Sequence, residues 1–373
     1  MPALFDPFTL KDVTLKNRIV VSPMCQYSAE DGLINDWHFS HLAGLARGGS
    51  ALVIAEAAAV SPEGRITPAD AGIWSDEQGA LWARAVKLIE GGGAVAGSQI
   101  AHAGRKANAN RPWEGDDHIA DDDPRAWEII APSAVAQGGG LPRTPREMTL
   151  ADIARVQADF VAAAARARDA GFRWLELHFA HGYLAQSFFS KHSNQRTDSY
   201  GGSFENRIRF AIETVRAVRE VWPANLPLTA RLGLIEFDEG DDVEESLEYV
   251  RRLKAEGVDL VDVSMGFTNN AAKIPWGPGL MAPLSARVRA EADVPTVTSW
   301  YIAEPAQADA IVASGQADLV ALGRPLLEEP HWPYRAAREL GVDNAAWTTL
   351  PAPYAHWLSR YRPAVERRET VAA

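Results

Sequence analysis

The sequence predicts a single (β/α)8 barrel of the TIM type, an α/β fold. Short apolar runs rich in β-branched residues alternate with longer amphipathic segments eight times along the 373 residues. Strands that alternate with helices in one direction run parallel, and eight such units close most economically as a barrel. We expect one domain over residues 1–363 and a flexible tail over residues 364–373. The predicted strands span residues 18–24, 51–60, 94–103, 173–180, 228–234, 259–265, 295–300 and 317–324.

Three further elements are predicted around these strands. Residues 4–16 contain two short apolar segments around Lys11 and Asp12, which predict a hairpin that plugs the bottom of the barrel. The stretch 104–148 is too long for an ordinary connection, so we expect a functional loop after the third strand. Residues 344–362 are dense in aromatic side chains, which predicts a tail that docks on its own barrel or on a neighbouring subunit.

Helix ends are also readable from the sequence. Thr149 and Asp152 are spaced as a capping box that opens a helix ending at Gly171. An open doubly wound sheet is the alternative fold, because residues 91–96 match the dinucleotide pattern G-x-G-x-x-A. Those glycines end a helix and open a strand, the reverse of what that motif requires, so the barrel is favoured. Other predicted helix stops are Gly91, Gly257, Gly315 and Gly341.

Composition limits the classes of partner. The formal net charge of −12 and the lack of a long Lys/Arg run oppose nucleic-acid binding. No run approaches the roughly 20 apolar residues of a membrane span, and the N-terminus does not resemble a signal peptide. Cys25 is the single cysteine, which is consistent with a reducing compartment. We therefore expect a cytoplasmic enzyme with no membrane or nucleic-acid partner.

The active site of such a barrel lies at the C-terminal ends of its strands. His178 and His181, with Tyr183 two residues further on, can present hydrogen-bond donors to one substrate oxygen and a proton to a neighbouring carbon. This pattern predicts a reduction site without a metal. Zinc is the alternative, but it needs a third ligand, for which Glu176 is a weak candidate. The other alternative is that both histidines are hydrogen-bonded core residues.

Other polar residues at the strand ends suggest an anionic cofactor. Arg231 would be a buried cation that needs an anion, either Glu176 on the adjacent strand or the N1–C2=O edge of a reduced flavin. Gln99 can read a flavin's pyrimidine edge or make a barrel-lining hydrogen bond. Gly323 and Arg324 stand where barrels bind phosphate, although a plain turn would also explain them. Cys25 has no local catalytic signature, so tuning of a cofactor ranks above nucleophilic catalysis.

The combined motifs resemble the old yellow enzyme family, in particular the thermophilic-like branch that includes xenobiotic reductase A. The likeness spans nearly the whole chain, and Cys25 in place of a threonine indicates the branch. Five segments carry it: Pro-Met-Cys-Gln-Tyr at 23–27, Gln-Ile-Ala-His-Ala-Gly-Arg at 99–105, His-Phe-Ala-His-Gly-Tyr-Leu at 178–184, Asn-Gln-Arg-Thr-Asp-Ser-Tyr-Gly-Gly-Ser-Phe-Glu-Asn-Arg at 194–207, and Gly323-Arg324.

This resemblance implies a bound FMN that NADPH or NADH reduces, followed by hydride transfer from flavin N5 to the β-carbon of an activated alkene. Small unsaturated carbonyl or nitro compounds are the implied substrates, and a homodimer or homotetramer is expected. Tyr183 would supply the proton to the α-carbon, while His178 and His181 would hold the substrate oxygen.

The resemblance also implies two sets of contact residues. Trp300 and Tyr301 depart from the family, since many relatives have glycine there, and their rings should narrow the mouth of the site. The implied substrate-binding residues besides the histidines are Tyr27, Trp300 and Trp357, the last from the chain's own tail or a neighbour's. The implied FMN-binding residues are Pro23, Met24, Cys25, Ala57, Gln99, Arg231, Ser299, Trp300, Gly323 and Arg324.

Two other functions were weighed against an ene-reductase. A flavin barrel of another class, such as a tRNA dihydrouridine synthase, would need a basic RNA-binding face, which the net charge opposes. A non-catalytic barrel would be expected to lack one of the polar residues of the site, and none is missing.

Overall fold

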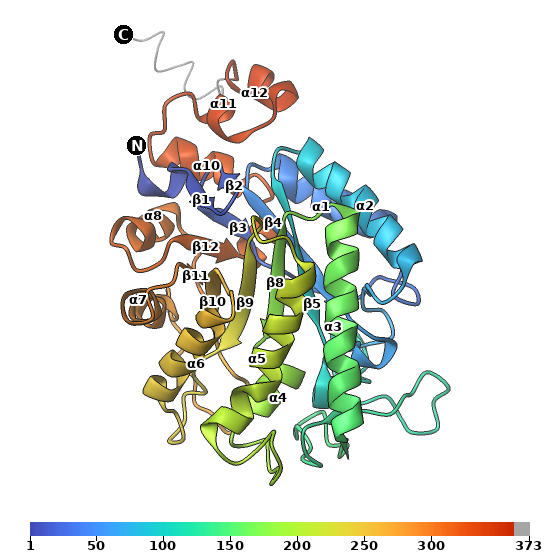
Figure 1. Ribbon diagram of the computed structural model, residues 1–373. Coiled ribbons are helices and arrows are strands. Elements are labelled where there is room, and N and C mark those ends of the chain that lie inside the picture. Colours follow the sequence, from blue (N-terminus) through green and yellow to red (C-terminus); the bar gives the residue numbers. More distant parts are fainter. Residues whose placement is uncertain (362–373) are drawn as a thin grey trace.

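The computed structural model describes residues 1–361 and confirms the predicted barrel (Figure 1). Eight parallel strands close on themselves in the order β10-β11-β12-β3-β4-β5-β8-β9. Each predicted strand contains one of them. Their bounds are β3 Ile19–Val21, β4 Leu52–Ala59, β5 Val95–Ala101, β8 Trp174–Phe179, β9 Leu228–Gly233, β10 Leu260–Ser264, β11 Thr296–Thr298 and β12 Leu319–Leu322. The tail predicted over residues 364–373 lies outside the described residues.

Helices surround the barrel and are buried on the face that contacts the strands. The long helix α3 begins where the capping box predicts it, because Thr149 accepts a hydrogen bond from the Asp152 amide and Asp152 bonds back to Thr149. It ends at Gly171, whose φ of 96° suits glycine. The helices are α1 Asp36–Arg47, α2 Asp76–Gly91, α3 Leu150–Ala170, α4 Leu184–Phe189, α5 Phe204–Val221, α6 Val243–Ala255, α7 Ala282–Glu291, α8 Pro305–Ala313, α9 Arg324–Glu328, α10 Trp332–Glu339, α11 Ala345–Thr349 and α12 Ala352–Leu358.

The predicted hairpin is present as β1 (Phe8–Leu10) paired antiparallel with β2 (Val13–Leu15). Val13 and Leu15 are fully buried in a cluster with side chains from the N-terminal part of the barrel. The hairpin therefore closes the end of the barrel opposite to α4, the helix that follows the C-terminal end of β8 (Figure 1).

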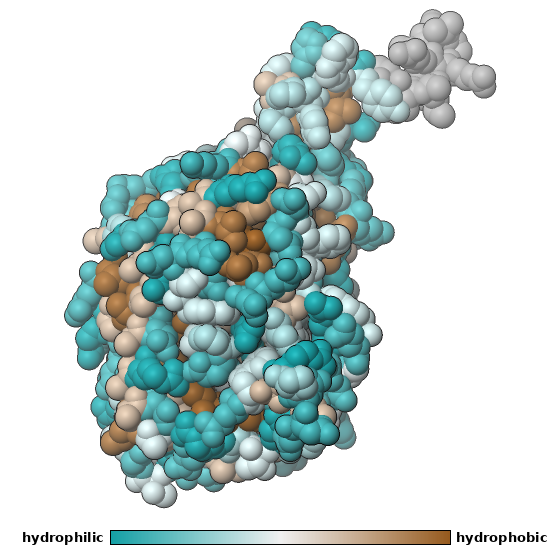
Figure 2. Space-filling model, turned by 90° about the vertical axis from the view of Figure 1, so that its right-hand side faces the viewer, coloured by the Kyte–Doolittle hydropathy of each residue, from teal (hydrophilic) through white to brown (hydrophobic). Residues whose placement is uncertain are grey.

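Two irregular segments complete the chain. Between β5 and α3 lie short 3-10 turns, Gly104–Lys106 and Pro112–Glu114, and a small parallel pair, β6 (Ile130–Ala131) with β7 (Arg146–Glu147). Helices α11 and α12 form a lobe that projects from the barrel (Figure 2). The lobe lies at the hairpin end, where Lys16 Nζ donates a hydrogen bond to the backbone oxygen of Thr349. Within the described part of the chain, no helix is both long and apolar enough to cross a lipid bilayer.

Candidate active site

Three rings gather just past the C-terminal end of β8. The centroid of the His178 ring lies 4.9 Å from that of His181 and 4.9 Å from that of Tyr183. His178 is on the strand itself, His181 has a φ of 61° in the following turn, and Tyr183 is the N-cap residue of α4. Gly182 makes this turn possible, because its φ is 72° and a Cβ there would lie 2.6 Å from the Phe267 backbone oxygen. The predicted catalytic residues are therefore brought together.

The hydrogen-bond partner of His178 determines which nitrogen carries its proton. The Ala180 amide donates to Nδ1 of His178 at 3.4 Å, so the neutral ring holds its proton on Nε2. Burial, with Arg231 and Lys106 adding repulsion, holds the pKa of His178 well below its usual value. His178 is thus a neutral ring whose Nε2–H can donate.

His181 carries its proton on the other nitrogen. Ser264 Oγ lies 2.7 Å from His181 Nε2 and accepts a hydrogen bond of 3.0 Å from the indole N–H of Trp300. Ser264 is fully buried, and among the described residues His181 Nε2 is the acceptor within reach of its hydroxyl proton. The Ser264 hydroxyl therefore donates to Nε2, which leaves the proton of the neutral His181 ring on Nδ1. Burial, Arg231, His178 and Lys106 all lower the pKa of His181.

Tyr183 remains a protonated phenol. Burial raises its pKa well above the usual value, and the nearby Cys25, Asp70 and Asp116 raise it further. A phenol in this environment can give up its proton only to a strongly basic site, such as a developing carbanion.

Lys106 is a member of this cluster that sequence reasoning missed. Its Nζ donates to the backbone oxygen of His181 at 2.6 Å and lies 5.7 Å from the centre of the Tyr183 ring. Burial lowers the pKa of Lys106 to about 8. Its place one residue beyond the motif at 99–105, after a barrel strand, was the signal that could have identified it.

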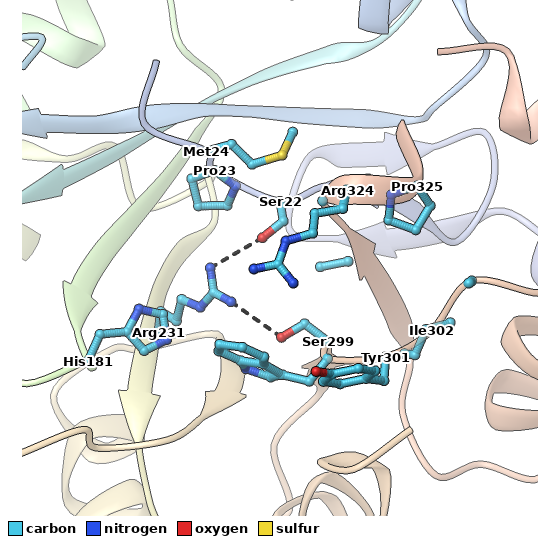
Figure 3. Close-up of a pocket in the computed structure, with 14 residues that line it drawn as sticks. Ser22, Pro23, Met24, His181, Arg231, Ser299, Tyr301, Ile302, Arg324 and Pro325 are labelled. Atoms are coloured by element: carbon cyan, nitrogen blue, oxygen red, sulfur yellow. Dashed lines mark hydrogen bonds between the residues drawn. The ribbon is translucent and has the colours of Figure 1, made fainter. Parts of the chain in front are cut away.

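A cavity of about 470 Å³ is lined by His181, one of the three rings. Arg231 and Arg324 extend into it from opposite walls, and Arg231 donates to Ser22 Oγ at 3.2 Å and to Ser299 Oγ at 3.3 Å (Figure 3). Two guanidinium groups that share one cavity favour an anionic occupant. Its lining is Ser22, Pro23, Met24, His181, Arg231, Ser299, Trp300, Tyr301, Ile302, Ala303, Ala321, Gly323, Arg324 and Pro325.

Glu176, one of the two partners considered for Arg231, does not form an ion pair with it. Arg231 Nε lies 3.2 Å from Asp262 Oδ2, whereas Glu176 accepts a hydrogen bond of 2.8 Å from Gln99. The strand register gives the reason, since Asp262 is directly opposite Arg231 and Glu176 is opposite Thr229. An aspartate in the middle of the apolar strand 259–265 was the available signal.

The ion pair is incomplete as a hydrogen-bonding arrangement. Within residues 1–361, Arg231 Nε has no hydrogen-bond partner, because its 3.2 Å contact with Asp262 Oδ2 lacks the alignment of a hydrogen bond, and the other oxygen, Asp262 Oδ1, is also buried without a partner. Burial raises the pKa of Asp262 to about 6, against the opposing effect of Arg231. The guanidinium thus retains capacity for a further anion.

The remaining predicted site residues lie in three places. Ala57 and Gln99 are cross-strand neighbours, and Ala57 also lines a void of about 10 Å³ together with Tyr183. Tyr27 packs edge-on against Trp113 at 5.9 Å between ring centroids, and Cys25 is half-buried next to it. Trp357 is separate, since it is 71% exposed on the lobe at the hairpin end. The structure does not place Trp357 at its own chain's site.

An aromatic wall covers one side of the cavity. Trp300 and Tyr301 have φ values of 74° and 55°, the left-handed conformation that glycine adopts most easily. Trp276 packs against Trp300 at 5.7 Å and against Tyr301 at 5.6 Å between ring centroids. Phe267 lies 5.6 Å from Trp300. Phe267 and Trp276 come from the loop after β10, and no pattern in the sequence indicated their role.

With this geometry in place, comparison with known proteins decides the family. The model of the NADH:flavin oxidoreductase / NADH oxidase family matches residues 3–343. The chain belongs to that family. It is 44% identical over 346 residues to an NADPH dehydrogenase from Geobacillus sp. (strain WCH70), with 92% of this chain and 96% of that protein covered.

Solved structures agree with this assignment. The old yellow enzyme homologue from Zymomonas mobilis superposes with a TM-score of 0.76 at 26% identity, covering 95% of this chain and 99% of that chain. A 2-naphthoyl-CoA reductase superposes with a TM-score of 0.82 at 25% identity, covering 90% of this chain. The present chain spans 52% of that longer reductase. The resemblance to old yellow enzymes inferred from the motifs is confirmed.

The cofactor of this flavin oxidoreductase is FMN, and its reductant is NADPH or NADH. The residues present fit FMN. The cavity has the size usual for small-molecule sites, its two guanidinium groups suit a phosphate and an electron-rich ring edge, and Pro23, Met24 and Trp300 offer apolar surface. Within residues 1–361, no group of three or more His, Cys, Asp or Glu side chains is arranged to hold a metal ion.

Proposed function

We propose that this protein is an ene-reductase that reduces small activated alkenes, namely α,β-unsaturated carbonyl or nitro compounds. The observation that carries the proposal is the clustering of His178, His181 and Tyr183, all three protonated, with His181 lining a cavity that suits FMN. FMN, when bound, supplies the hydride for the β-carbon of the alkene. The curated NADPH dehydrogenase relatives favour a small-molecule flavin enzyme over a tRNA dihydrouridine synthase.

The two histidines act as oxyanion donors. As the alkene accepts a hydride, negative charge develops on its carbonyl or nitro oxygen, and two fixed N–H groups stabilise that charge. Both rings are neutral, so neither loses its proton to the oxygen in advance. Their partners on the far side, the Ala180 amide and the Ser264 hydroxyl, keep the donating nitrogens directed away from the protein backbone.

Tyr183 acts as the proton donor to the α-carbon. Its raised pKa keeps the proton in place until the carbon becomes basic, which links proton transfer to hydride transfer. The resulting phenolate regains its proton from solvent, and the Lys106 ammonium group near the ring lowers the cost of that charge.

The other proposed contacts with FMN and with the substrate are assigned mainly to residues that line the cavity or lie near it. We assign Arg324 and Gly323 to the FMN phosphate and Arg231 to the flavin's electron-rich edge, because all three line the cavity. Tyr27 and Trp300 form substrate walls, while Trp357 can serve only a neighbouring subunit, which favours a homodimer or homotetramer. We propose a cytoplasmic location. Further proposed FMN contacts are Pro23, Met24, Cys25, Ala57, Gln99, Ser299 and Trp300.

Anaerobic stopped-flow measurement of the Tyr183→Phe variant tests this assignment. We expect reduction of the flavin by NADPH to stay within about threefold of wild type, while reoxidation by 2-cyclohexenone slows by roughly 10²- to 10⁴-fold, the usual contribution of a general acid. Equal slowing of both half-reactions would refute the role of Tyr183. A wild-type protein that binds no FMN would refute the proposed function as a whole.

A further inference from the structure

The carboxyl group of Glu56 lies outside the site described above, yet it contacts the turn that bears the flavin-facing residues. That turn, residues 23–27, contains Met24, Cys25 and Tyr27, and Tyr27 has a strained φ of 48°. Such a conformation needs external support. Glu56 provides it, because its Oε2 accepts a hydrogen bond of 3.0 Å from the Gln26 amide.

A β-bulge explains how Glu56 reaches the turn. Along β4, Ala55 pairs with Ser98 and Ala57 pairs with Gln99, so Glu56 is one extra residue opposite the gap between two consecutive residues of β5. An extra residue re-aims its side chain, and bulges of this kind are common next to active sites. Without the bulge, regular alternation would direct residue 56 differently and leave the Gln26 amide without this acceptor.

A histidine on helix α1 completes the arrangement. His38 Nε2 lies 3.4 Å from Glu56 Oε1, and both side chains are buried. The Asn35 backbone amide donates to His38 Nδ1 at 3.2 Å as part of the helix capping box, so the neutral ring keeps its proton on Nε2. Among the described residues Nε2 has no hydrogen-bond partner, because its contact with Glu56 lacks the geometry of a hydrogen bond. The Glu56 carboxyl is thus hydrogen-bonded to the turn and packed against the His38 ring of α1.

We propose that Glu56 is a positioning residue for the flavin-facing turn and that its carboxyl, hydrogen-bonded to the residue after Cys25, places a titratable charge against this turn. The effect of Glu56 on turnover rests on the proposed function. Its contact with the turn does not depend on that function. The charged or titratable groups that face Glu56 are His38 from α1, Cys25 from the turn and Asp70 from the segment after β4. His41 acts on it only through His38.

The charge of the Glu56 carboxyl changes near neutral pH, while the His38 ring beside it keeps one charge state. Burial raises the pKa of Glu56 to about 8, the Gln26 hydrogen bond opposes this, and Asp70 adds to it. Burial lowers the pKa of His38 to about 4, so His38 stays neutral throughout. Burial also raises the pKa of Cys25 well above its usual value, and Asp70 and Glu56 raise it further. Ionisation of Glu56 above pH 8 therefore opposes ionisation of Cys25.

The alkylation of Cys25 by iodoacetamide tests the charge, because this is the chain's single cysteine. We expect the rate in Glu56→Gln to rise tenfold per pH unit between pH 7 and pH 9, with a shallower rise in wild type above pH 8. At pH 9 the variant should react roughly three- to tenfold faster than wild type, which corresponds to half to one pKa unit. Glu30→Gln is the control, because it removes an exposed carboxyl close to Cys25 in the sequence. Its rate of alkylation should equal that of wild type at every pH. Superimposable profiles for wild type and Glu56→Gln, or an equal shift in Glu30→Gln, would overturn the proposal.

Hydrogen exchange of the purified holoprotein tests the positioning role without any turnover. Glu56→Gln keeps an oxygen acceptor for the Gln26 amide, so exchange in the peptide around residue 26 should stay within about twofold of wild type. Glu56→Ala removes that acceptor, and exchange there should accelerate about tenfold, as expected for one lost hydrogen bond. Unchanged exchange in Glu56→Ala would overturn the role. Faster exchange across the whole barrel would also count against it, because it would show general destabilisation.

Discussion

Replacing Ser264 with alanine isolates the effect of the protonation pattern of His181. Ser264 touches neither the cavity nor the other histidine, and its Oγ connects the Trp300 indole to His181 Nε2 at 3.0 and 2.7 Å. Without that hydroxyl, His181 can hold its proton on either nitrogen. The substrate oxygen then loses one fixed N–H donor in part of the molecules.

The size of the effect follows from what one oxyanion donor contributes. Complete loss of such a donor slows a reaction by roughly 10²- to 10³-fold. Partial loss slows reoxidation of the reduced flavin by 2-cyclohexenone in proportion to the share of molecules that lose the Nδ1 proton, so we expect about two- to tenfold, or ~0.4 to ~1.4 kcal/mol in the barrier. Hydride transfer from NADPH to the flavin does not use this oxyanion, so that half-reaction should change less than about threefold.

Anaerobic stopped-flow absorbance resolves the two half-reactions, and ¹⁵N NMR of labelled histidine reports the tautomer of His181 directly. Ser285→Ala is a matched control, because Ser285 is equally buried but bonds only to the Met281 backbone oxygen in α7. Its kinetics should equal those of wild type. The reasoning fails if Ser264→Ala leaves the ¹⁵N shifts of His181 unchanged, or if both half-reactions slow by the same factor.

Three other predictions concern the cofactor, the substrate wall and stability. Arg324→Ala should weaken the binding of FMN at least tenfold, whereas the binding of riboflavin, which lacks the phosphate, should stay within about twofold of wild type. Equal losses of affinity for both flavins in fluorescence titration would contradict a phosphate contact. Trp276→Ala should open the aromatic wall and raise kcat/KM for bulky enones relative to 2-cyclohexenone, and an unchanged ratio would remove Trp276 from the wall. Thr149→Ala should lower the free energy of unfolding by about 1 kcal/mol in urea denaturation. An unchanged free energy would show that the Thr149 cap does not stabilise the protein.

The sequence was informative wherever local patterns determine structure. Strand periodicity and the capping box of Thr149 depend on neighbours in the chain, so the barrel and the start of α3 could be predicted. The cluster of His178, His181 and Tyr183 was also predictable, because six consecutive residues hold all three.

Features that depend on register or on distant loops were not predictable. The sequence could not identify Asp262 as the ion-pair partner of Arg231, because strand register decides whether Glu176 or Asp262 stands opposite. Trp276 reaches the site from a loop whose path no periodicity encodes. The bulge at Glu56 is a one-residue shift in a strand that is buried at every position, so no alternation of buried and exposed residues marks it.

The left-handed backbone at Trp300 carries a strain that the packing of its own side chain outweighs. Glycine at this position would relieve roughly 1–2 kcal/mol of backbone strain. The same exchange would remove a ring that packs against Trp276, Phe267 and His181, and truncation of a packed aromatic side chain costs up to about 3–5 kcal/mol. It would also delete the indole N–H that donates to Ser264. Engineers seeking a heat-resistant catalyst should therefore keep Trp300 and look for stabilising changes elsewhere in the barrel.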